Sequence, residues 1–342
     1  MIFTGDTSLP FKDAIELEIP SNLSNKNWII NLEGALVDKS SIYLKDNLVV
    51  NSVDAIEQLS SKIKCSIALN NNHIFDNNNF EETKNSLNKM GLKSFGAGSN
   101  LNEASKPLVI ESEKLIVLGF GWSIIGCKYA SEKSEGVNPL INKYVISELQ
   151  KYKNIYKKYS IICMFHWNYE LEQYPMPSQR YLAHNLIDLG CDAVIGLHPH
   201  RVQGYEIYND KPIIYSLGNW MFRQNIYRQG KLKFPDFCNL QLAFEFSNKG
   251  DHKCHFFNYD SISNKVSFIK TESLPFNSLL KKSIFSGMGN LEYEKWFVKN
   301  RYHKKIIPVY KHSDSEILEN IKNYFNFFRT SFINFLVKYN LK

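Results

Sequence analysis

The sequence predicts an α/β fold in which two sheets pack face to face with helices on the outside. Short apolar runs alternate with helical patterns through the first two hundred residues, which is typical of a largely parallel sheet. After His200, short strand-like runs are separated by Asn-Asp, Asn-Lys-Gly-Asp and Ser-Asn turns, which indicates an antiparallel second half. Two packed sheets accommodate both halves.

The expected elements follow in chain order. Strands are expected at 1–5, 28–33, 65–69, 115–120, 161–165 and 193–195, and helices at 51–62, 80–90, 143–156 and 179–189. Gly91 stands where a glycine ends a helix, directly after the segment that begins at Phe80. The later strands are expected at 205–208, 213–217, 240–246, 255–259 and 266–269.

Composition limits the class of protein. A chain of 342 residues with 44% hydrophobic residues is an ordered globular protein with a substantial core. Its six cysteines are scattered without a Cys-x-x-Cys pair, so we expect reduced core thiols in a cytosolic protein. We see neither a signal peptide nor an apolar run of about 18 residues that would span a membrane.

Charge is concentrated at the C-terminal end. Residues 277–342 contain 12 Lys and Arg against 5 Asp and Glu, which equals the net charge of +7 of the whole chain. Residues 1–276 are therefore formally neutral, which disfavours a nucleic-acid-binding protein. We expect a main domain at 1–276 and a basic, aromatic helical extension at 277–342.

Polar side chains stand at or just after the ends of several expected strands. They are Asp6, Glu33, Asn72, His166, His198 and His200. Parallel strands end at the same edge of a sheet, so the three imidazoles are expected to meet there. Mixed oxygen and nitrogen donors suit Mn²⁺, Zn²⁺ or Fe, and Glu33 could bridge two such ions.

An ordered series of short motifs carries a family resemblance. The motifs are Gly5-Asp6, Asn31-Leu32-Glu33, Asn71-Asn72-His73 with Asp76, Gly96-Ala97-Gly98-Ser99-Asn100 with Glu103-Ala104, His166-Trp167 with Glu170, His198-Pro199-His200 with Gln203, and Tyr215-Ser216-Leu217-Gly218-Asn219. Together they resemble the poly-γ-glutamate capsule-biosynthesis (CapA-type) family, which is similar to the calcineurin-like metallophosphoesterases. The resemblance covers roughly residues 2–222.

The resemblance implies a four-layer αββα sandwich of two mixed sheets, metallophosphoesterase-like, with one or two metal ions at the strand ends. The implied ligands are Glu33, Asn72, His166 and His198 around one ion, and Asp6, Glu33 and His200 around the other. His73 is the implied general acid, and Asp76 orients it.

Three positions depart from the family patterns. Ser8 stands where metallophosphoesterases have a histidine in their first motif, which leaves one metal position a ligand poorer. Leu197 replaces a common histidine, and Asn168 a common glycine. Neither the departure at Leu197 nor that at Asn168 removes a proposed ligand.

Each assignment has a structural alternative. The histidines could be ordinary loop residues, Asp6 could cap a turn, and Glu33 could be an exposed turn residue. In the Asn-rich run Asn71 is an alternative to Asn72, and His73 could only hydrogen-bond a ligand. Arg201 could contact an anionic substrate, although a solvated surface position is the favoured interpretation.

The sequence thus predicts a metal-dependent hydrolase of capsule or surface-polysaccharide biosynthesis. It would cleave a phosphoester of a phosphorylated or polymeric surface glycan. The alternatives are a non-catalytic assembly module of a polymer-synthesis complex and hydrolysis of a γ-linked amide.

The C-terminal extension has a helical apolar pattern with basic residues between. Its apolar positions are Ile317, Leu318, Ile321, Tyr324, Phe325, Phe328, Phe332, Phe335, Leu336 and Tyr339. This pattern fits a helix on an anionic membrane surface, so the cytoplasmic protein could be membrane-associated. Packing on the sandwich is the favoured alternative.

Overall fold

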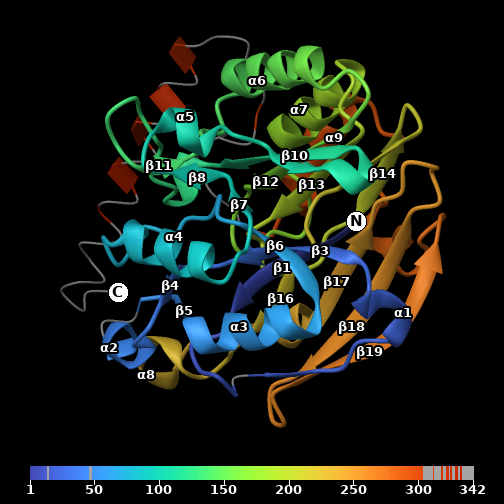
Figure 1. Ribbon diagram of the computed structural model, residues 1–342. Helices are drawn as coiled ribbons and strands as arrows, with labels where there is room; N and C mark the ends of the chain where they lie inside the picture. The colour runs from blue at the N-terminus through green and yellow to red at the C-terminus, as the bar shows by residue number, and fades with distance from the viewer. Residues whose placement is uncertain are drawn as a thin grey trace.

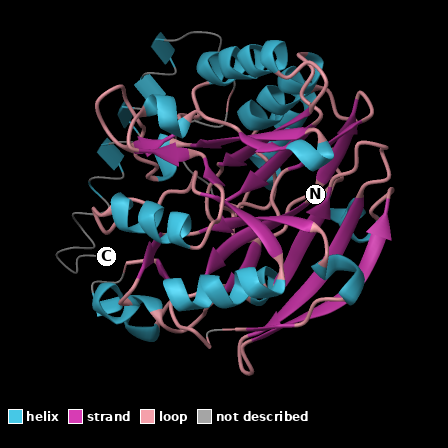
Figure 2. Cartoon of the chain, viewed as in Figure 1, coloured by secondary structure: helices cyan, strands magenta, loops and turns pink. Residues whose placement is uncertain are grey.

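The computed structural model describes residues 1–13, 15–45 and 48–302, together with residues 311, 317–318, 321–322, 324–325, 328–329 and 332. Two large sheets lie face to face, and helices cover both outer sides (Figures 1 and 2). The strands that end at the candidate site run through the middle of this arrangement.

The larger sheet has nine strands within the described residues. They are β2 (Glu16–Leu17), β19 (Lys265–Ser273), β18 (Lys253–Asp260), β17 (Leu240–Glu245), β1 (Ile2–Ser8), β3 (Asn27–Leu32), β6 (Lys64–Ala68), β7 (Ser94–Phe95) and β16 (Asn219–Phe222). Strand β1 is parallel to β3 and β16 but antiparallel to β17. It therefore joins the parallel and antiparallel parts of the sheet.

The smaller sheet has six strands in the same described ranges. They are, in spatial order, β14 (Tyr205–Tyr208), β15 (Lys211–Ile214), β13 (Ala193–Leu197), β12 (Ser160–His166), β10 (Leu115–Gly121) and β9 (Leu108–Ile110). The four central strands are parallel, and the two edge strands are antiparallel to their neighbours.

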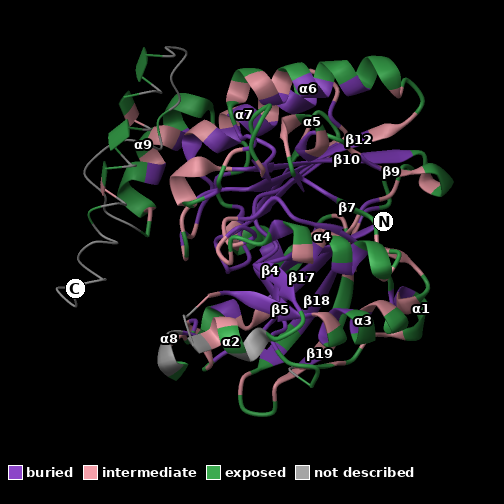
Figure 3. Cartoon of the chain, turned by 60° about the vertical axis from the view of Figure 1, so that its left-hand side comes forward, coloured by how far each residue is buried: buried purple, intermediate pink, exposed green. Residues whose placement is uncertain are grey.

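Three hydrophobic cores define four layers. One core, with Phe3, Ile162 and Phe256, lies between the sheets. The second packs α3 (Val53–Lys62) and α4 (Phe80–Lys89) on the larger sheet, and the third packs α6 (Asn142–Ile155), α7 (Pro177–Asp188) and α9 (Asn290–Asn300) on the smaller one. In Figure 3 the sheets are almost wholly buried and the outer helix faces are exposed. The predicted αββα sandwich is confirmed.

The remaining helices and strands are short. They are α1 (Ser21–Ser24), β4 (Ala35–Val37), α2 (Ser40–Lys45), β5 (Val50–Ser52), β8 (Ala97–Gly98), α5 (Leu101–Ala104), β11 (Gly136–Val137) and α8 (Tyr227–Gly230). Four single 3-10 turns are described at Glu111–Glu113, Ser123–Ile125, Asp236–Cys238 and Asn277–Lys282.

The later strands differ from expectation in how they are shared between sheets. The chain after β15 leaves the smaller sheet and crosses to β1 of the larger one, so the strand expected over 213–217 ends at Ile214. Gly218, at φ +73°, lies in this crossing. The antiparallel strands β17–β19 then extend the sheet that β1 began. The two sheets are therefore not the two halves of the sequence.

Residues 277–302 pack on the sandwich. Phe285, Tyr293 and Phe297 are buried in the core beside α7, and Arg180 of α7 donates to the carbonyl oxygen of Met288 at 2.9 Å. All six cysteines are free, and five of them are buried. Among the described helices, none is long and apolar enough to cross a bilayer.

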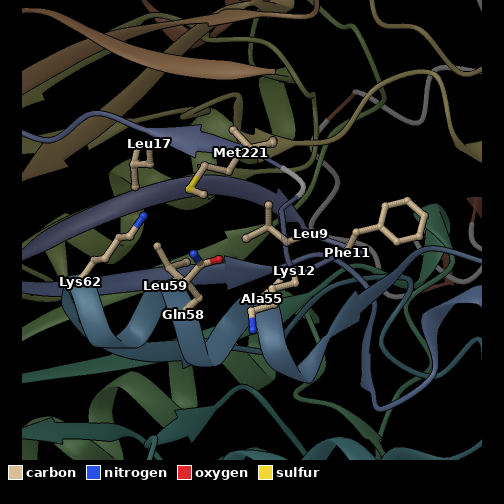
Figure 4. A pocket seen from close by; sticks show the side chains of 10 residues that line it. Leu9, Phe11, Lys12, Leu17, Ala55, Gln58, Leu59, Lys62 and Met221 are labelled. Atoms are coloured by element: carbon tan, nitrogen blue, oxygen red, sulfur yellow. The ribbon is translucent and has the colours of Figure 1, made fainter. Parts of the chain in front are cut away.

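A groove lies between α3 and the start of the chain (Figure 4). Leu9, Leu59 and Met221 form part of its apolar wall, and Lys12 and Lys62 also line it. Its volume is about 20 Å³, roughly the space of one or two water molecules. It is too small for a substrate, and none of the proposed metal ligands lines it.

Candidate metal centre

The two sheets bring the ends of their parallel strands together. Asp6 is in β1, Glu33 directly follows β3, His166 ends β12, and His198 directly follows β13. All four side chains are buried. The predicted convergence therefore occurs between two sheets, with carboxylates from one and imidazoles from the other.

Glu33, His166 and His198 form a compact group. One donor atom from each lies within 4.8 Å of the others, and within the described chain this is the group suited to a metal ion. His166 Nε2 lies 3.6 Å from Glu33 Oε2 and 3.2 Å from His198 Nδ1. Asn72 Oδ1 is 2.7 Å from the same His166 Nε2. Asn72 thus adjoins the three-residue group through a direct hydrogen bond to His166.

The surroundings of Glu33 fit a cation. Among the described residues, neither of its carboxylate oxygens has a hydrogen-bond partner, although both are buried. Burial, followed by the charge of Asp6, raises the pKa of Glu33 well above its ordinary value. Burial likewise lowers the pKa of His166 well below its ordinary value. A divalent cation would satisfy a buried carboxylate and neutral imidazoles together.

Asp6 is beside this group, but both of its carboxylate oxygens accept hydrogen bonds from other residues of the protein. Its Oδ1 accepts from Asn31 Nδ2 at 2.7 Å, and its Oδ2 accepts from the backbone N–H of His198 at 3.1 Å. His200 Nδ1 lies 3.3 Å from Asp6 Oδ2 and 2.9 Å from Asn219 Oδ1. Burial raises the pKa of Asp6 to about 6. Asp6 and His200 form a hydrogen-bonded set adjoining the three-residue group.

Ser8 occupies the position of the missing family histidine. Its hydroxyl is hydrogen-bonded to the hydroxyl of Tyr227, which also donates to the carbonyl oxygen of Val50. Both residues are buried. The hydroxyl of Ser8 is therefore already hydrogen-bonded to Tyr227, a residue from a distant segment of the chain.

His73 is at the rim of the group. Its Nδ1 is 2.6 Å from Asp76 Oδ2, and its Nε2 is 3.9 Å from Glu33 Oε1. The side chain is 29% exposed, so it contacts solvent as well as the buried donors. The pairing of His73 with Asp76 expected from the resemblance is present.

The Asn-rich run has a defined register. Asn71 Oδ1 accepts from the backbone N–H groups of Gly34 and His73, and its Nδ2 donates to Leu32. Asn70 Nδ2 donates to the carbonyl oxygens of Phe120 and Met164 in the other sheet. Asn72 is the member of the run that reaches His166.

Arg201 is not a solvated surface residue, and that interpretation was wrong. It is 8% exposed, its guanidinium lies 4.1 Å from the centre of the Phe237 ring, and its Nη1 donates to Leu171. Its Nε has no hydrogen-bond partner among the described residues. The surface interpretation failed because the segment that covers Arg201 is distant in sequence.

The backbone around the imidazoles is unusual. His198 and His200 have φ of +90° and +56°, in a region that side-chain-bearing residues rarely adopt. A Cβ on Gly5 would lie 1.9 Å from the carbonyl oxygen of Gly218, so only glycine fits there. Such backbone conformations recur at functional sites.

Four residues near the site had no role assigned from sequence. Asn31 and Asn219 were present in the motifs, and for Asn31 the available signal was its position two residues before Glu33. Tyr227 lies outside every motif, and nothing in the sequence connects it with Ser8. Asn70 was part of the Asn-rich run but was not distinguished from its neighbours.

The chain is an αββα sandwich whose two sheets bring a candidate metal site together at their strand ends. Residues 20–224, more than half of the chain, match the family model described as bacterial capsule synthesis protein PGA_cap. The chain belongs to this family.

Curated relatives match only in part. PGA biosynthesis protein CapA of Bacillus subtilis (strain 168) is 33% identical over 163 residues, which cover 45% of this chain and 41% of that protein. A probable polyglutamine synthesis accessory protein of Mycobacterium tuberculosis is 26% identical over 210 residues, covering 58% and 54%. The solved structure of TT1561 from Thermus thermophilus covers 80% of this chain and 98% of that one at 12% identity, with a TM-score of 0.35.

Proposed function

We propose that this protein is a metal-dependent hydrolase of capsule or surface-polysaccharide biosynthesis that cleaves a phosphoester. The supporting observation is the buried Glu33 carboxylate without hydrogen-bond partners among the described residues, next to His166 and His198. A bound divalent ion would supply Lewis acidity toward phosphoryl oxygens and would acidify water. Mn²⁺, Zn²⁺ and Fe all suit this donor set.

Each residue has a distinct proposed role. Glu33, Asn72, His166 and His198 hold the ion. Asp6 supports the loop that carries His198 through its backbone N–H, 3.1 Å away. His73, fixed at Nδ1 by Asp76, presents Nε2 to the site and protonates the leaving group. Arg201 is the proposed anion-binding group, although its buried position requires the substrate to approach beside Phe237.

The geometry favours one ion over two. Both oxygens of Asp6 already accept hydrogen bonds, His200 is paired with Asn219, and Ser8 is paired with Tyr227. A second ion would have to share the Asp6 oxygens with these hydrogen bonds and would find no donor at Ser8 that is not already paired. Elemental analysis should therefore give about one ion per chain, and Mn²⁺ should show the spectrum of an isolated rather than a coupled ion.

Activity on generic phosphoesters tests the reaction class. With Mn²⁺, Zn²⁺ or Fe²⁺, His198→Ala should abolish hydrolysis, whereas His184→Gln should retain it, because the His184 ring contacts Glu206 and Tyr208 and none of the proposed metal ligands. Equal rates for His198→Ala and the unmodified protein would contradict the proposal. A γ-glutamyl anilide in the same assay distinguishes amide from phosphoester cleavage.

Leaving-group dependence tests His73 separately. His73→Gln should slow an alkyl phosphate by about 10²- to 10⁴-fold. A nitrophenyl ester should be affected less, because its leaving group needs little protonation. Equal losses on both substrates would assign His73 to metal support instead.

The second candidate function is a non-catalytic accessory module of a polymer-synthesis complex. The observation that favours it is Ser8, whose hydroxyl is committed to Tyr227. A relative bearing the name of accessory protein is consistent with this role. Stoichiometric metal without turnover on any phosphoester, together with co-purification of a membrane synthase, would favour this candidate.

A further inference from the structure

Exposed apolar side chains gather on the described residues between 317 and 332, which we call the C-terminal stripe. Its members are Ile317, Leu318, Ile321, Tyr324, Phe325, Phe328 and Phe332, which are 40–72% exposed. The described residues here have helical backbone, and the apolar positions follow one another in the three- and four-residue steps that one face of a helix shows in sequence. Helices of globular proteins normally bury such a face. These seven side chains are instead exposed.

Positive charge accompanies the stripe. Lys322 and Arg329 lie within it against one acidic residue of the sequence, Glu319, and the exposed Lys281 and Lys295 belong to the neighbouring segment that packs beside α7. Residues 277–342 hold the entire net charge of +7. Apolar and basic groups are therefore combined on one part of the molecule.

The C-terminal segment contacts α9 and lies near Tyr169. Lys311 Nζ is 2.9 Å from Glu294 Oε1 of α9. Burial raises the pKa of Tyr169 to about 12, and the nearby Arg329 guanidinium opposes this rise. Tyr169 follows His166 by three residues. Figure 3 shows exposed parts of the C-terminal segment beside α9.

We propose that the C-terminal stripe docks on an anionic membrane surface. A bilayer interface takes up aromatic and aliphatic side chains, while its anionic headgroups neutralise Lys and Arg. A second copy of this chain would bring the same positive charges together. A soluble polyanion would neutralise the charge but leave the apolar stripe in water. A membrane accounts for both properties.

Docking would hold the edge of the sheet that carries His166 near the membrane. Substrates attached to a membrane would then reach the candidate metal centre without diffusing through solution. The docking itself does not depend on turnover, so it can be tested in a protein that lacks the metal ligands.

Flotation of the full-length protein with vesicles tests the proposal. Vesicles of phosphatidylcholine with phosphatidylglycerol should bind the protein at low salt, and 0.5 M salt should weaken binding because it screens headgroup charge. Vesicles of phosphatidylcholine alone should bind it weakly. Phe325→Ser with Phe328→Ser, and separately Lys322→Glu with Arg329→Glu, should each reduce binding at least about tenfold.

Matched controls use residues away from the stripe. Ile262→Ser removes an apolar side chain that is 92% exposed on the β18–β19 turn, and Lys249→Glu reverses an exposed charge on another turn. Both should bind like the unmodified protein, as should His198→Ala. Phe325 and Phe328 are exposed and Lys322 and Arg329 are partly exposed, so circular dichroism melts should be little changed.

Four outcomes would overturn the proposal. They are no binding to anionic vesicles at low salt, equal binding to neutral vesicles, equal losses in stripe and control variants, and a dimer that the Phe325 and Phe328 changes dissociate. The dimer would assign the stripe to a second copy of the chain. Loss of phosphoesterase activity alone, with vesicle binding intact, would count against the proposed reaction and not against docking.

Discussion

Glu33 and Glu206 are both buried carboxylates, and their surroundings are opposite. Glu206 in β14 accepts from Arg180 Nε at 2.8 Å and Nη2 at 2.7 Å, and from the hydroxyl of Tyr215 at 2.6 Å. His184 Nε2 is 3.1 Å from it. Glu33 accepts no hydrogen bond from the described residues.

The pKa values differ accordingly. Burial alone would raise the pKa of Glu206, but the hydrogen bonds from His184 and Arg180 outweigh it and lower the pKa to about 2. For Glu33, burial and Asp6 act in the same direction and raise the pKa. The protein stabilises the charge of Glu206 with its own groups. Glu33 has no such partners among the described residues, as expected of a carboxylate that binds a ligand under the proposed function.

Arg180→Met should give the largest change in stability. It would leave Glu206 buried without its cation and would break the contact between α7 and Met288. Loss of one partner of a buried pair costs about 3–5 kcal/mol. Urea unfolding measures the effect. Lys211→Met, which removes an exposed partner of Asp192, is the control and should cost at most about 1 kcal/mol.

The second-largest effect should be the loss in acid of the contribution that Glu206 makes to the free energy of unfolding. Its pKa is lower in the folded protein than its ordinary 4.5, so its contribution is complete above pH 4.5 and is lost as pH falls toward about 2. The shift corresponds to about 3 kcal/mol. Unfolding free energies of Glu206→Gln and of the unmodified protein should therefore converge between these pH values. A constant difference across that range would show that the charge of Glu206 is not what stabilises the cluster.

Glu33→Gln should weaken metal binding without destabilising the metal-free protein, in contrast to the substitutions around Glu206. Metal affinity should fall by more than about 100-fold, because direct ligands matter at least as much as the groups that orient them. The metal-free protein should be as stable as before or more stable, since an uncompensated buried charge is removed. Calorimetric titration and urea unfolding measure the two quantities. Destabilisation of the metal-free protein would remove the distinction between Glu33 and Glu206.

The fold was largely predictable because its strands and helices carry local patterns. Alternation of apolar runs with helical spacing located β1, β3, β6, β10, β12 and β13 and the helices α3, α4, α6 and α7. The sharing of strands between sheets was not predictable. The crossing at residues 215–218 depends on the distant pairing of β16 with β1, and no local pattern records it.

The site was predictable to the extent that strand ends signal ligands. Position after an apolar run identified Glu33, His166 and His198, and the structure brings these three together. Position after an apolar run could not distinguish these three residues from Asp6 and His200. What distinguishes them is that Asp6 and His200 are hydrogen-bonded to Asn31 and Asn219. The burial of Arg201 under Phe237 was also invisible, since their contact joins segments whose patterns are unrelated.

Asn168 offers the smallest test, of whether the backbone beside His166 is fixed without metal. It has φ +68°, its Oδ1 accepts from Tyr169 N–H at 2.8 Å, and its Nδ2 donates to Tyr174 at 3.1 Å. Asn168→Gly keeps the backbone conformation and loses the hydrogen bonds, whereas Asn168→Ala also meets the left-handed penalty of about 1–2 kcal/mol. Alanine should therefore be the less stable variant by about that amount in urea unfolding of the metal-free protein. If both variants were equally stable, the loop would relax out of this conformation, and the metal centre would be organised by its ligand instead of by the chain.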